Sequence, residues 1–435
     1  MAKVSKIKQL RKKDSPSLSV IGATGLDRSA GQINEEWLRQ LKGTNAVNVY
    51  RQMRDNDAII GAFMFAVESL VRQVRFYAKP ANKTPEAIAE AEFVESCMRD
   101  MSHTFSDLLS EVLSMLVFGW SYFEKVYKIR KGPNEKDPKH RSRFTDGRIG
   151  WRKISIRAQD TLDHWEFDDD GGIRGMWQMS PPNYNLTFIP IERSLLFRTQ
   201  TNKNNPEGRS VLRNAYRSYY FKKRLEEIEA IGVERDLSGL PVLEVPPEIM
   251  STAASAADKS LRTSLENMVQ QIKRDEREGM VIPSELDQDG KPTGYRFRLL
   301  NSGGRRAVDV DGAIKRYESR MAMAVMAEFL LLGMDKVGSF ALASTKTHLF
   351  SVALGSMIDS ICQTFTRFAI GDLMRVNGVD PKLWPTLEHG DIESPELKEI
   401  ASFVSNLTDA GVLVPDETLE RRMRELAGLP KPDEE

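Results

Sequence analysis

The chain has 435 residues, of which 40% are hydrophobic and 8% aromatic, so it is long enough to bury more than one core and to divide into several structural regions. Its 62 basic residues balance 62 acidic ones, which excludes a general electrostatic attraction to nucleic acid or to a membrane surface. The two cysteines, Cys97 and Cys362, have no His or Cys at metal-ligand spacing and are interpreted as buried thiols in a reducing compartment.

The first part of the chain is expected to form a flexible arm followed by helices. Residues 1–34 are basic at the start and lack periodicity, which indicates a disordered end or a segment that touches nucleic acid or an acidic partner. Residues 35–76 become helical, with one apolar face formed by Ile59, Phe63, Ala66, Val67, Leu70 and Val74. Two further helices are expected over 87–100 and 105–118, and residues 120–129 alternate as in a strand.

Residues 131–200 are expected to be rich in β-structure, because short apolar stretches alternate with turn signals. Within them, Asp168, Asp169 and Asp170 precede two glycines. Three carboxylates could bind Mg²⁺ or Ca²⁺. The glycines, however, suit a tight turn at the tip of a solvated hairpin, and this interpretation is favoured.

The most informative segment is a long, charged helix predicted from Glu207 to Asp236, which would reach roughly 45 Å. Its apolar residues form only a broken stripe: Val211, Leu212, Ala215, Tyr219, Leu225, Ile228 and Ile231. Aromatic and basic residues interleave over 216–224, which resembles a nucleic-acid surface, although on a helix the aromatic residues are better placed for packing. Such a helix needs support from other copies of the chain or from a second domain.

The remaining chain alternates short strands with long helices. Strands are expected at 242–245, 280–282 and 294–301, with a helix over 256–278. A second long helix runs over 308–332, and Gly333 provides a stop signal.

Beyond Gly333, the sequence GMDKVGSFALAST is either a simple connection between helices or a functional loop. A helix then follows over 345–376, and one or two more lie in the tail at 395–435.

Signatures of enzymes are missing from the sequence. There is no phosphate-binding P-loop, no H-E-x-x-H, no G-x-S-x-G and no paired C-x-x-C, and the five histidines are scattered. We therefore expect no catalytic activity, no cofactor and no metal.

A membrane partner is also not expected. The most apolar segment, Met321–Met334, contains Glu328 and is shorter than the roughly 20 residues that span a bilayer. No apolar signal-peptide core follows the basic N-terminus, so a soluble, cytoplasmic product is expected.

The chain resembles the portal proteins of tailed bacteriophages, in particular the subgroup of Mu-like phages. The resemblance rests on four segments in the order MRDNDAIIGAFMFAVESLVRQVRF, LVFGWSYFEKVYK, NPEGRSVLRNAYRSYYFKKRLEEIEAIGVERDLSGLPVLEVP and AEFLLLG before GSFALAST. It covers most of residues 45–376.

The resemblance implies an α+β, predominantly helical fold with the wing, two-helix stem, clip and crown of portal proteins. The expected regions follow in chain order: an N-terminal arm (1–34), the wing (35–205), the first stem helix (206–236), the clip (237–304), the second stem helix (305–332), the tunnel loop (333–345), a long helix that closes the wing (346–394) and the crown and tail (395–435).

The resemblance also implies a ring, usually of twelve subunits, at one vertex of the capsid, through which double-stranded DNA is packaged and ejected. Implied partners are the terminase large subunit, a head–tail adaptor and the major capsid or scaffolding protein. The implied location is the virion, and the host cytoplasm during assembly. The tunnel-loop residues that would meet DNA are Lys336, Val337, Gly338, Ser339 and Phe340.

Residues of the first stem helix are expected to pair across neighbouring subunits: Tyr219, Lys222, Lys223, Arg224, Glu226 and Glu227. Two other functions remain open from the sequence alone. One is a metal-dependent enzyme that processes nucleic acid through Asp168–Asp170, and the other is a helical scaffold or adaptor without a channel.

Overall fold

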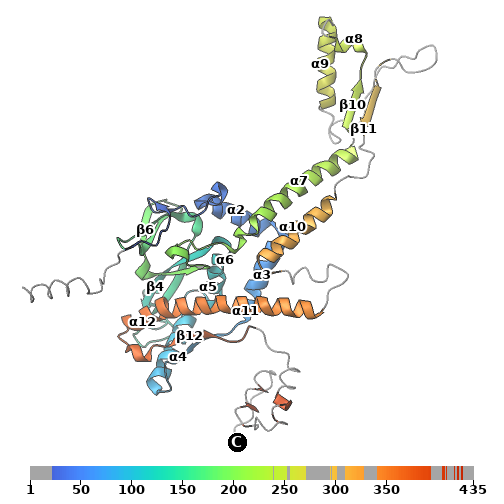
Figure 1. Ribbon diagram of the computed structural model, residues 1–435. Helices are drawn as coiled ribbons and strands as arrows, with labels where there is room; N and C mark the ends of the chain where they lie inside the picture. The colour runs from blue at the N-terminus through green and yellow to red at the C-terminus, as the bar shows by residue number, and fades with distance from the viewer. Residues whose placement is uncertain are drawn as a thin grey trace, which may run out of the picture. The chain divides into compact units, whose positions relative to one another are not determined.

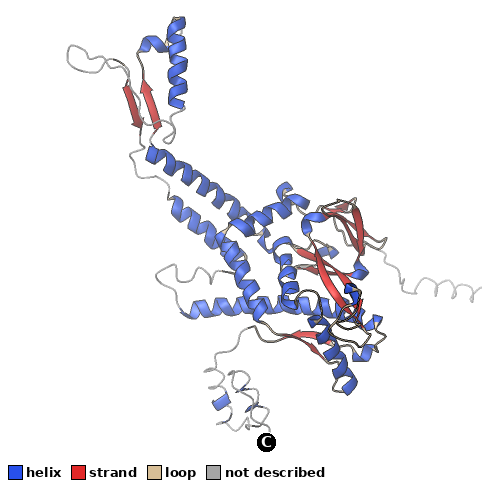
Figure 2. Cartoon of the chain, turned by 180° about the vertical axis from the view of Figure 1, so that it is seen from behind, coloured by secondary structure: helices blue, strands red, loops and turns tan. Residues whose placement is uncertain are grey.

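The computed structural model describes residues 22–238, 240–251, 255–270, 294, 296–300, 309–327 and 340–392, with scattered residues between 404 and 424 (Figure 1). The chain divides into two compact units, one of residues 1–216 with 321–435 and the other of residues 217–320. Both contain helices and antiparallel strands (Figure 2), so the predicted α+β class is confirmed. Within the described part of the chain, no helix is both long and apolar enough to cross a bilayer.

The N-terminal part of the first unit is mostly helical. Its helices are α2 (Gly43–Asn56), α3 (Ala58–Gln73), α4 (Pro85–Arg99), α5 (Phe105–Val112) and α6 (Ser114–Phe118). Asp57 separates α2 from α3, because its side chain accepts hydrogen bonds from the backbone N–H groups of Ile59 and Ile60 and caps α3. Leu113 separates α5 from α6, so the single helix predicted over 105–118 is wrong.

The buried face of α3 agrees in part with the predicted one. The helix buries Ile60, Phe63, Val67 and Val71, and Val74 at its end is buried as well, so Phe63, Val67 and Val74 are confirmed, whereas Ile59, Ala66 and Leu70 are only partly buried. Ile60, Phe63, Val67 and Val71 follow one another at spacings of three and four, which places them on one side of the helix.

Two small sheets form the β-rich core of the first unit. In the first, β4 (Trp120–Ile129) lies between β5 (Ile149–Arg157) and β9 (Ser194–Arg198). In the second, β7 (Ile173–Met179) lies between β6 (Leu162–Phe167) and β8 (Leu186–Pro190). The buried residues Trp120, Tyr122, Trp165, Met176 and Ile189 join the two sheets in one cluster.

Part of the predicted N-terminal arm is ordered. Residues 1–21 lie outside the described residues, but β1 (Arg28–Ser29) and β2 (Gln32–Ile33) form an antiparallel pair. Between them, the carbonyl of Gly31 accepts a hydrogen bond from the backbone N–H of Trp165 over 3.0 Å. The expectation of a flexible arm is therefore wrong for this hairpin, because it contacts β6.

The helix α11 (Phe340–Phe365) completes the first unit with a π-helical turn (Thr366–Ile370) and α12 (Gly371–Val376). After them, β12 (Thr386–His389) pairs with β3 (Phe76–Lys79), and this pairing joins the two stretches of sequence that form the first unit. The side chain of Lys125 on β4 is buried, donates a hydrogen bond of 2.7 Å to the carbonyl of Phe368 in the π-helical turn and forms an ion pair with Asp372. Burial lowers the pKa of Lys125, and Asp372 opposes this effect.

A pair of glycines joins the turn before β4 to the loop formed by residues 199–210. Gly119 and Gly208 have φ values of 93° and 55°, a region that side chains with a Cβ rarely adopt. A Cβ on Gly119 would lie 2.4 Å from the backbone oxygen of Glu207, and a Cβ on Gly208 would lie 2.3 Å from that of Gly119. We call this contact the glycine junction. It requires glycine at both positions, because the two backbones touch.

The glycine junction also explains where the long charged helix begins. Ser210 donates its hydroxyl to the carbonyl of Val117 over 2.5 Å and caps a short 3-10 turn at Val211–Arg213. The residues before this turn are used in the junction, so α7 runs over Tyr216–Ser238 and does not start at Glu207 as predicted.

The second unit contains most of α7 and α10 (Val310–Ala324), which are side by side (Figures 1 and 2). Its other elements are β10 (Leu240–Glu244), α8 (Pro247–Met250), α9 (Ala256–Gln270) and β11 (Arg296–Leu300), with β10 and β11 antiparallel. The strand predicted at 280–282 lies outside the described residues.

The helix α10 ends earlier than predicted. The N–H of Ala327 donates to the carbonyl of Ala322 over 2.8 Å, and that of Met326 donates to the carbonyl of Met323 over 3.2 Å. These two bonds form a Schellman motif, in which the left-handed position is occupied by Met326 with a φ of 58°. The helix therefore ends at Ala324 and not at Leu332.

Replacing either glycine of the junction should destabilise the first unit strongly. Gly119→Ala or Gly208→Ala adds backbone overlap to an unfavourable φ, and we expect a loss of about 3 kcal/mol or more in the free energy of unfolding. Gly147→Ala is the matched control, because Gly147 has a φ of 70° but nothing within 4 Å of its Cβ position. It should cost about 1 kcal/mol. Equal losses for the three variants in denaturant unfolding would contradict the role of the junction.

Glu207, inside the junction, should make stability depend on pH. Burial raises the pKa of Glu207 from 4.5 to about 7, and the hydrogen bond of 3.2 Å from Trp165 Nε1 opposes only part of this shift. The folded chain thus binds the extra proton between these values, and its stability decreases as pH rises through this window.

Glu207→Gln retains the hydrogen-bond acceptor and removes the charge. Its melting temperature should equal that of the unchanged chain below about pH 4.5 and exceed it increasingly up to about pH 7, with a constant difference above. The control is Glu192→Gln at an exposed turn. If the difference in melting temperature between Glu207→Gln and the unchanged chain were the same at every pH, the assignment would be refuted.

Candidate functional site

The pair of helices α7 and α10 contains most of the residues that the sequence assigned to an interface. Lys222 on α7 is only 5% exposed, and its Nζ lies 3.2 Å from Glu318 Oε1 on α10 and 3.6 Å from Glu226 Oε1. Phe221 stacks on Tyr317 of α10, with ring centroids 6.0 Å apart. Lys222 therefore has partners in its own chain, and it connects the two helices of one subunit.

The other predicted interface residues of α7 differ in exposure. Tyr219 is buried, whereas Lys223, Arg224, Glu226 and Glu227 are exposed. Arg224 Nη1 lies 3.6 Å from Glu227 Oε2 on the same helix. An exposed pair of this kind contributes little to stability. Whether these residues contact a second copy stays a prediction.

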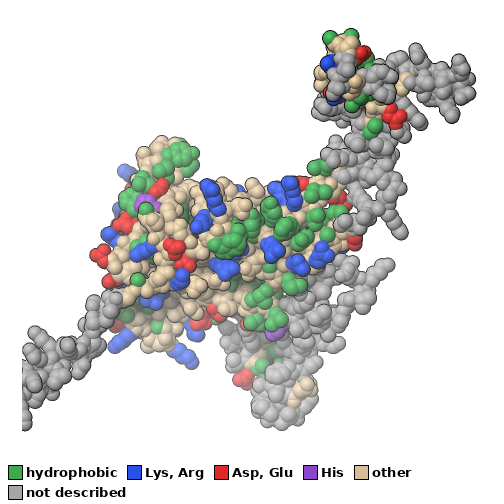
Figure 3. All heavy atoms as spheres, turned by 45° about the horizontal axis from the view of Figure 1, so that its top comes forward, with side chains coloured by type: hydrophobic (Ala, Val, Ile, Leu, Met, Phe, Trp, Pro, Cys, Tyr) green, Lys and Arg blue, Asp and Glu red, His purple; other side chains and the backbone are tan. Residues whose placement is uncertain are grey.

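An apolar stripe is exposed on α7, and it consists of Tyr220, Phe221, Ile228 and Ile231. At 100° per residue, these positions lie on one side of the helix, while Tyr219 and Lys222 lie on the other. Their exposed fractions are between 41% and 53%, which is high for four large apolar side chains on one helix. Figure 3 shows hydrophobic side chains gathered among Lys and Arg on the face that it views. We call these four residues the α7 stripe.

Of the five predicted tunnel-loop residues, the structure describes only Phe340. Lys336, Val337, Gly338 and Ser339 lie outside the described residues. Phe340 is the first residue of α11, so its assignment to a loop is wrong. The helix was expected from 345, but the Ala, Leu and Ser residues between Phe340 and Thr345 continue it without a break.

The acidic residues considered as a metal site form a turn. Asp168–Gly172 connects β6 to β7, and the N–H of Gly172 donates to Asp168 Oδ1 over 2.5 Å. The three aspartates are exposed, and Gly171 has a φ of 81°. The predicted hairpin tip is confirmed. No group of three or more potential metal ligands occurs among the residues that the structure describes.

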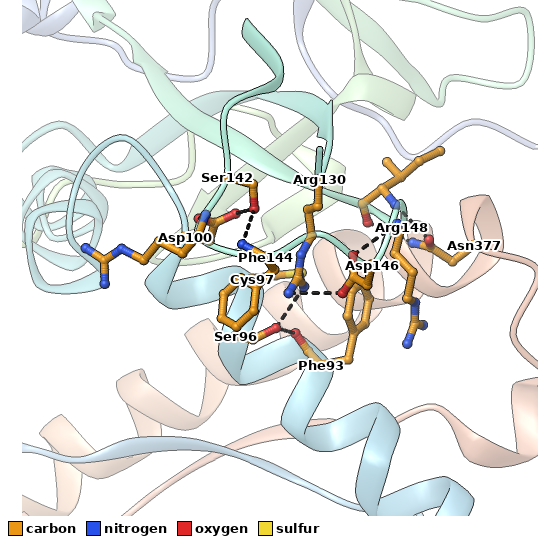
Figure 4. A network of polar contacts seen from close by, with 12 residues as sticks. Phe93, Ser96, Cys97, Asp100, Arg130, Ser142, Phe144, Asp146, Arg148 and Asn377 are labelled. Carbon is orange, nitrogen blue, oxygen red and sulfur yellow. Dashed lines mark hydrogen bonds and ion pairs between the residues drawn. The ribbon is translucent and has the colours of Figure 1, made fainter. Parts of the chain in front are cut away.

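A network of buried charges, which the sequence did not reveal, holds the loop of residues 130–148 against α4 (Figure 4). The side chains of Lys128 and Asp100 are 6% and 4% exposed, and Lys128 Nζ lies 2.9 Å from Asp100 Oδ2. Asp100 also accepts hydrogen bonds from Ser142 Oγ over 2.6 Å and from the backbone N–H of Arg143 over 2.9 Å. Burial raises the pKa of Asp100, but these donors outweigh it and the pKa is below its usual value.

Arg130 forms the second part of this network. Its Nη1 donates to Ser96 Oγ over 2.8 Å, and its Nη2 lies 3.1 Å from Asp146 Oδ2. The guanidinium also lies over the ring of Phe144, 4.0 Å from the centroid. A buried ion pair adds little net stability, so the main effect of the network is to fix the conformation of the loop.

Comparison with known proteins identifies the family. The family model for the portal protein of Mu bacteriophage matches residues 47–425. A chain from the neck of an empty gene transfer agent (GTA) particle, computed with C6 symmetry, has 12% identity and a TM-score of 0.54, covering 94% of this chain and 98% of that chain. A chain from the neck of a native GTA particle, computed with C12 symmetry, has 12% identity and a TM-score of 0.51, covering 88% and 94%.

At this level of identity, the two structures show a shared fold and nothing more. The family match covers most of the sequence, including α7, α10 and the glycine junction. The resemblance seen in the sequence is therefore confirmed, and the chain belongs to the family of Mu bacteriophage portal proteins.

Proposed function

We propose that the chain assembles into a ring at one vertex of a capsid and surrounds the channel through which double-stranded DNA is packaged and ejected. The observation that supports this proposal most directly is the α7 stripe on a helix that is already paired with α10 through Lys222 and Glu318. The pair has satisfied its internal contacts, yet four large apolar side chains remain exposed. Contact with an identical neighbour would remove them from water.

The symmetry of related particles supports the ring. The two GTA necks with the same fold were computed with C6 and C12 symmetry. A contact in which the α7 stripe meets a different surface of the next copy is heterologous, and heterologous contacts close into rings when the rotation permits. Twelve subunits remain our proposal for the ring of this chain.

The proposed regions follow the two compact units. We assign α7 and α10 to the stem, and the segment between them, which includes β10, β11, α8 and α9, to the clip. The wing comprises 35–205 and 340–394, the tunnel loop lies before α11 within 333–339, and the crown begins at 395. The clip would dock the terminase large subunit and the head–tail adaptor, and the wing would contact the capsid or scaffolding protein.

The charge balance of the chain suits a channel. A protein that neutralises many phosphates releases counterions and holds DNA tightly, which would resist movement. With 62 basic and 62 acidic residues, the chain has no excess charge for such binding. The proposed location is the virion, after assembly in the host cytoplasm.

Ring assembly should depend on the α7 stripe. Ile228→Glu or Ile231→Glu places a charge where an apolar contact is proposed, and loss of each contact costs about 2 kcal/mol or more. We expect the protein concentration needed for ring formation to rise at least about tenfold, as measured by mass photometry and negative-stain imaging.

The matched control for this test is Ala230→Glu, because Ala230 is exposed on the same helix but lies outside the stripe. It should assemble like the unchanged chain. Rings with an axial hole that form equally well from all three variants would contradict the proposed contact.

Lys336 provides a separate test of the channel. Lys336→Glu in the proposed tunnel loop should reduce the amount of DNA packaged per particle, because it replaces a transient phosphate contact by repulsion. Lys336→Arg is the control and should package normally. Unchanged packaging by intact Lys336→Glu rings would remove this residue from the mechanism, though not the loop.

A further inference from the structure

A hollow of about 750 Å³ lies in the first unit. It is bounded by the end of α3, the start of β3, the C-terminal end of α4 and the start of α5. Arg72, Arg75, Arg99 and Arg143 line it, and we call it the arginine cavity. Its volume is in the range of pockets that bind ligands, about 300–1,000 Å³.

The chain neutralises these arginines incompletely. Arg72 Nη1 lies 3.6 Å from Glu68 Oε1, its Nη2 lies 3.8 Å from Asp107 Oδ1, and its Nε donates to Ser106 Oγ over 3.2 Å. Arg99 Nη2 lies 3.6 Å from Glu95 Oε2. The two arginines are 47% and 68% exposed, so these pairs are screened by water. The guanidinium groups of Arg75 and Arg143 have no ion pair or hydrogen bond with a described residue. The cavity therefore retains positive charge.

The buried part of the lining, which we call the inner part of the cavity, is apolar. Its lining includes the buried residues Val74, Met98 and Leu109 together with Phe76 and Phe105. The rings of Phe76 and Phe105 meet edge to face, with centroids 5.6 Å apart. An apolar wall beneath a rim of guanidinium groups suits a ligand that combines carboxylates with an apolar side chain.

One polar atom of the lining lacks a partner. His103 Nε2 is buried and has no hydrogen bond among the described residues. Burial lowers the pKa of His103, so its imidazole is neutral at pH 7 and can accept or donate one hydrogen bond. Buried polar atoms are nearly always satisfied, and a bound ligand would satisfy this one.

The network of buried charges holds one wall of the cavity in place. Asp100 accepts the backbone N–H of Arg143 over 2.9 Å, while Lys128 and Ser142 fix Asp100 itself. The backbone that presents the Arg143 guanidinium is thus fixed before any ligand binds. Such preorganisation increases affinity, because less conformational entropy is lost on binding.

We propose that the arginine cavity binds an acidic peptide segment of a partner protein, whose carboxylates pair with Arg75 and Arg143 and whose apolar side chain enters the inner part. Guanidinium groups bind carboxylates through paired hydrogen bonds. Duplex DNA would meet only the rim and leave the apolar wall uncovered, so it fits the cavity less well. This proposal does not depend on ring formation.

The test uses the full chain and a fluorescein-labelled peptide, Glu-Asp-Phe-Glu-Asp, with binding followed by fluorescence anisotropy. Arg75→Glu combined with Arg143→Glu should weaken binding at least about tenfold, because each lost charge-assisted hydrogen bond contributes about a factor of ten or more. Arg39→Glu combined with Lys136→Glu is the matched control, since both residues are exposed, lie outside the cavity and give the same change in net charge.

Three comparisons decide the result. The proposal is supported if the control retains peptide binding and the variant with Arg75→Glu and Arg143→Glu loses it. Both variants must unfold at the same denaturant concentration as the unchanged chain. Equal binding of a Gln-Asn-Phe-Gln-Asn peptide would refute carboxylate recognition. Absence of peptide binding at 1 mM, or a duplex oligonucleotide that binds more tightly and is lost in the same double variant, would refute a peptide ligand.

Discussion

The contact between the backbones at Gly119 and Gly208 is the constraint on which the arrangement of the first unit depends. It joins the turn that starts the central strand β4 to the loop that leads into α7. Because the carbonyl oxygens lie where a Cβ would have to be, no other residue allows this approach. The same contact encloses Glu207 beside Trp165 and determines the residue at which α7 can begin.

Buried charges are a second feature that recurs in the structure. Lys125, Lys128 and Lys222 are nearly inaccessible to water, and each has an acidic partner. All three connect elements that are distant in sequence or lie on separate helices. Burial of a charge is costly, so a wrong arrangement that leaves one of these lysines without its partner is disfavoured strongly. Portal proteins are structural components of the particle, and in this chain the three lysines connect elements of the fold.

The sequence predicts the types of elements well and their ends less well. Helical periodicity identified α4, alternation identified β4, and turn residues identified the hairpin at Asp168–Gly172. The start of α7 could not be predicted, because it is determined by a contact with Gly119 that is remote in sequence. The end of α10 was missed because Met326 occupies a position where Gly is usual.

The residues of the candidate site could also be predicted only in part. The apolar residues Ile228 and Ile231 were found from the sequence, but alternation along β4 did not show that Lys125 and Lys128 are buried, since a central strand is covered on both faces. Lys222 was assigned to a contact between subunits, whereas the structure pairs it with Glu318 of its own chain. Sequence spacing identifies i,i+4 partners such as Glu226, but not a partner on another helix.

The first unit is built from two separate stretches of sequence, and this has a consequence for biosynthesis. Residues 1–216 leave the ribosome long before β12, which is the pairing partner of β3, and before Asp372, which is the partner of Lys125. Until residues 321–392 have been translated, β3 lacks its pairing strand and Lys125 lacks its acidic partner. Completion of the first unit must therefore wait for its C-terminal stretch of sequence, and the intervening helices can pair before this unit is finished.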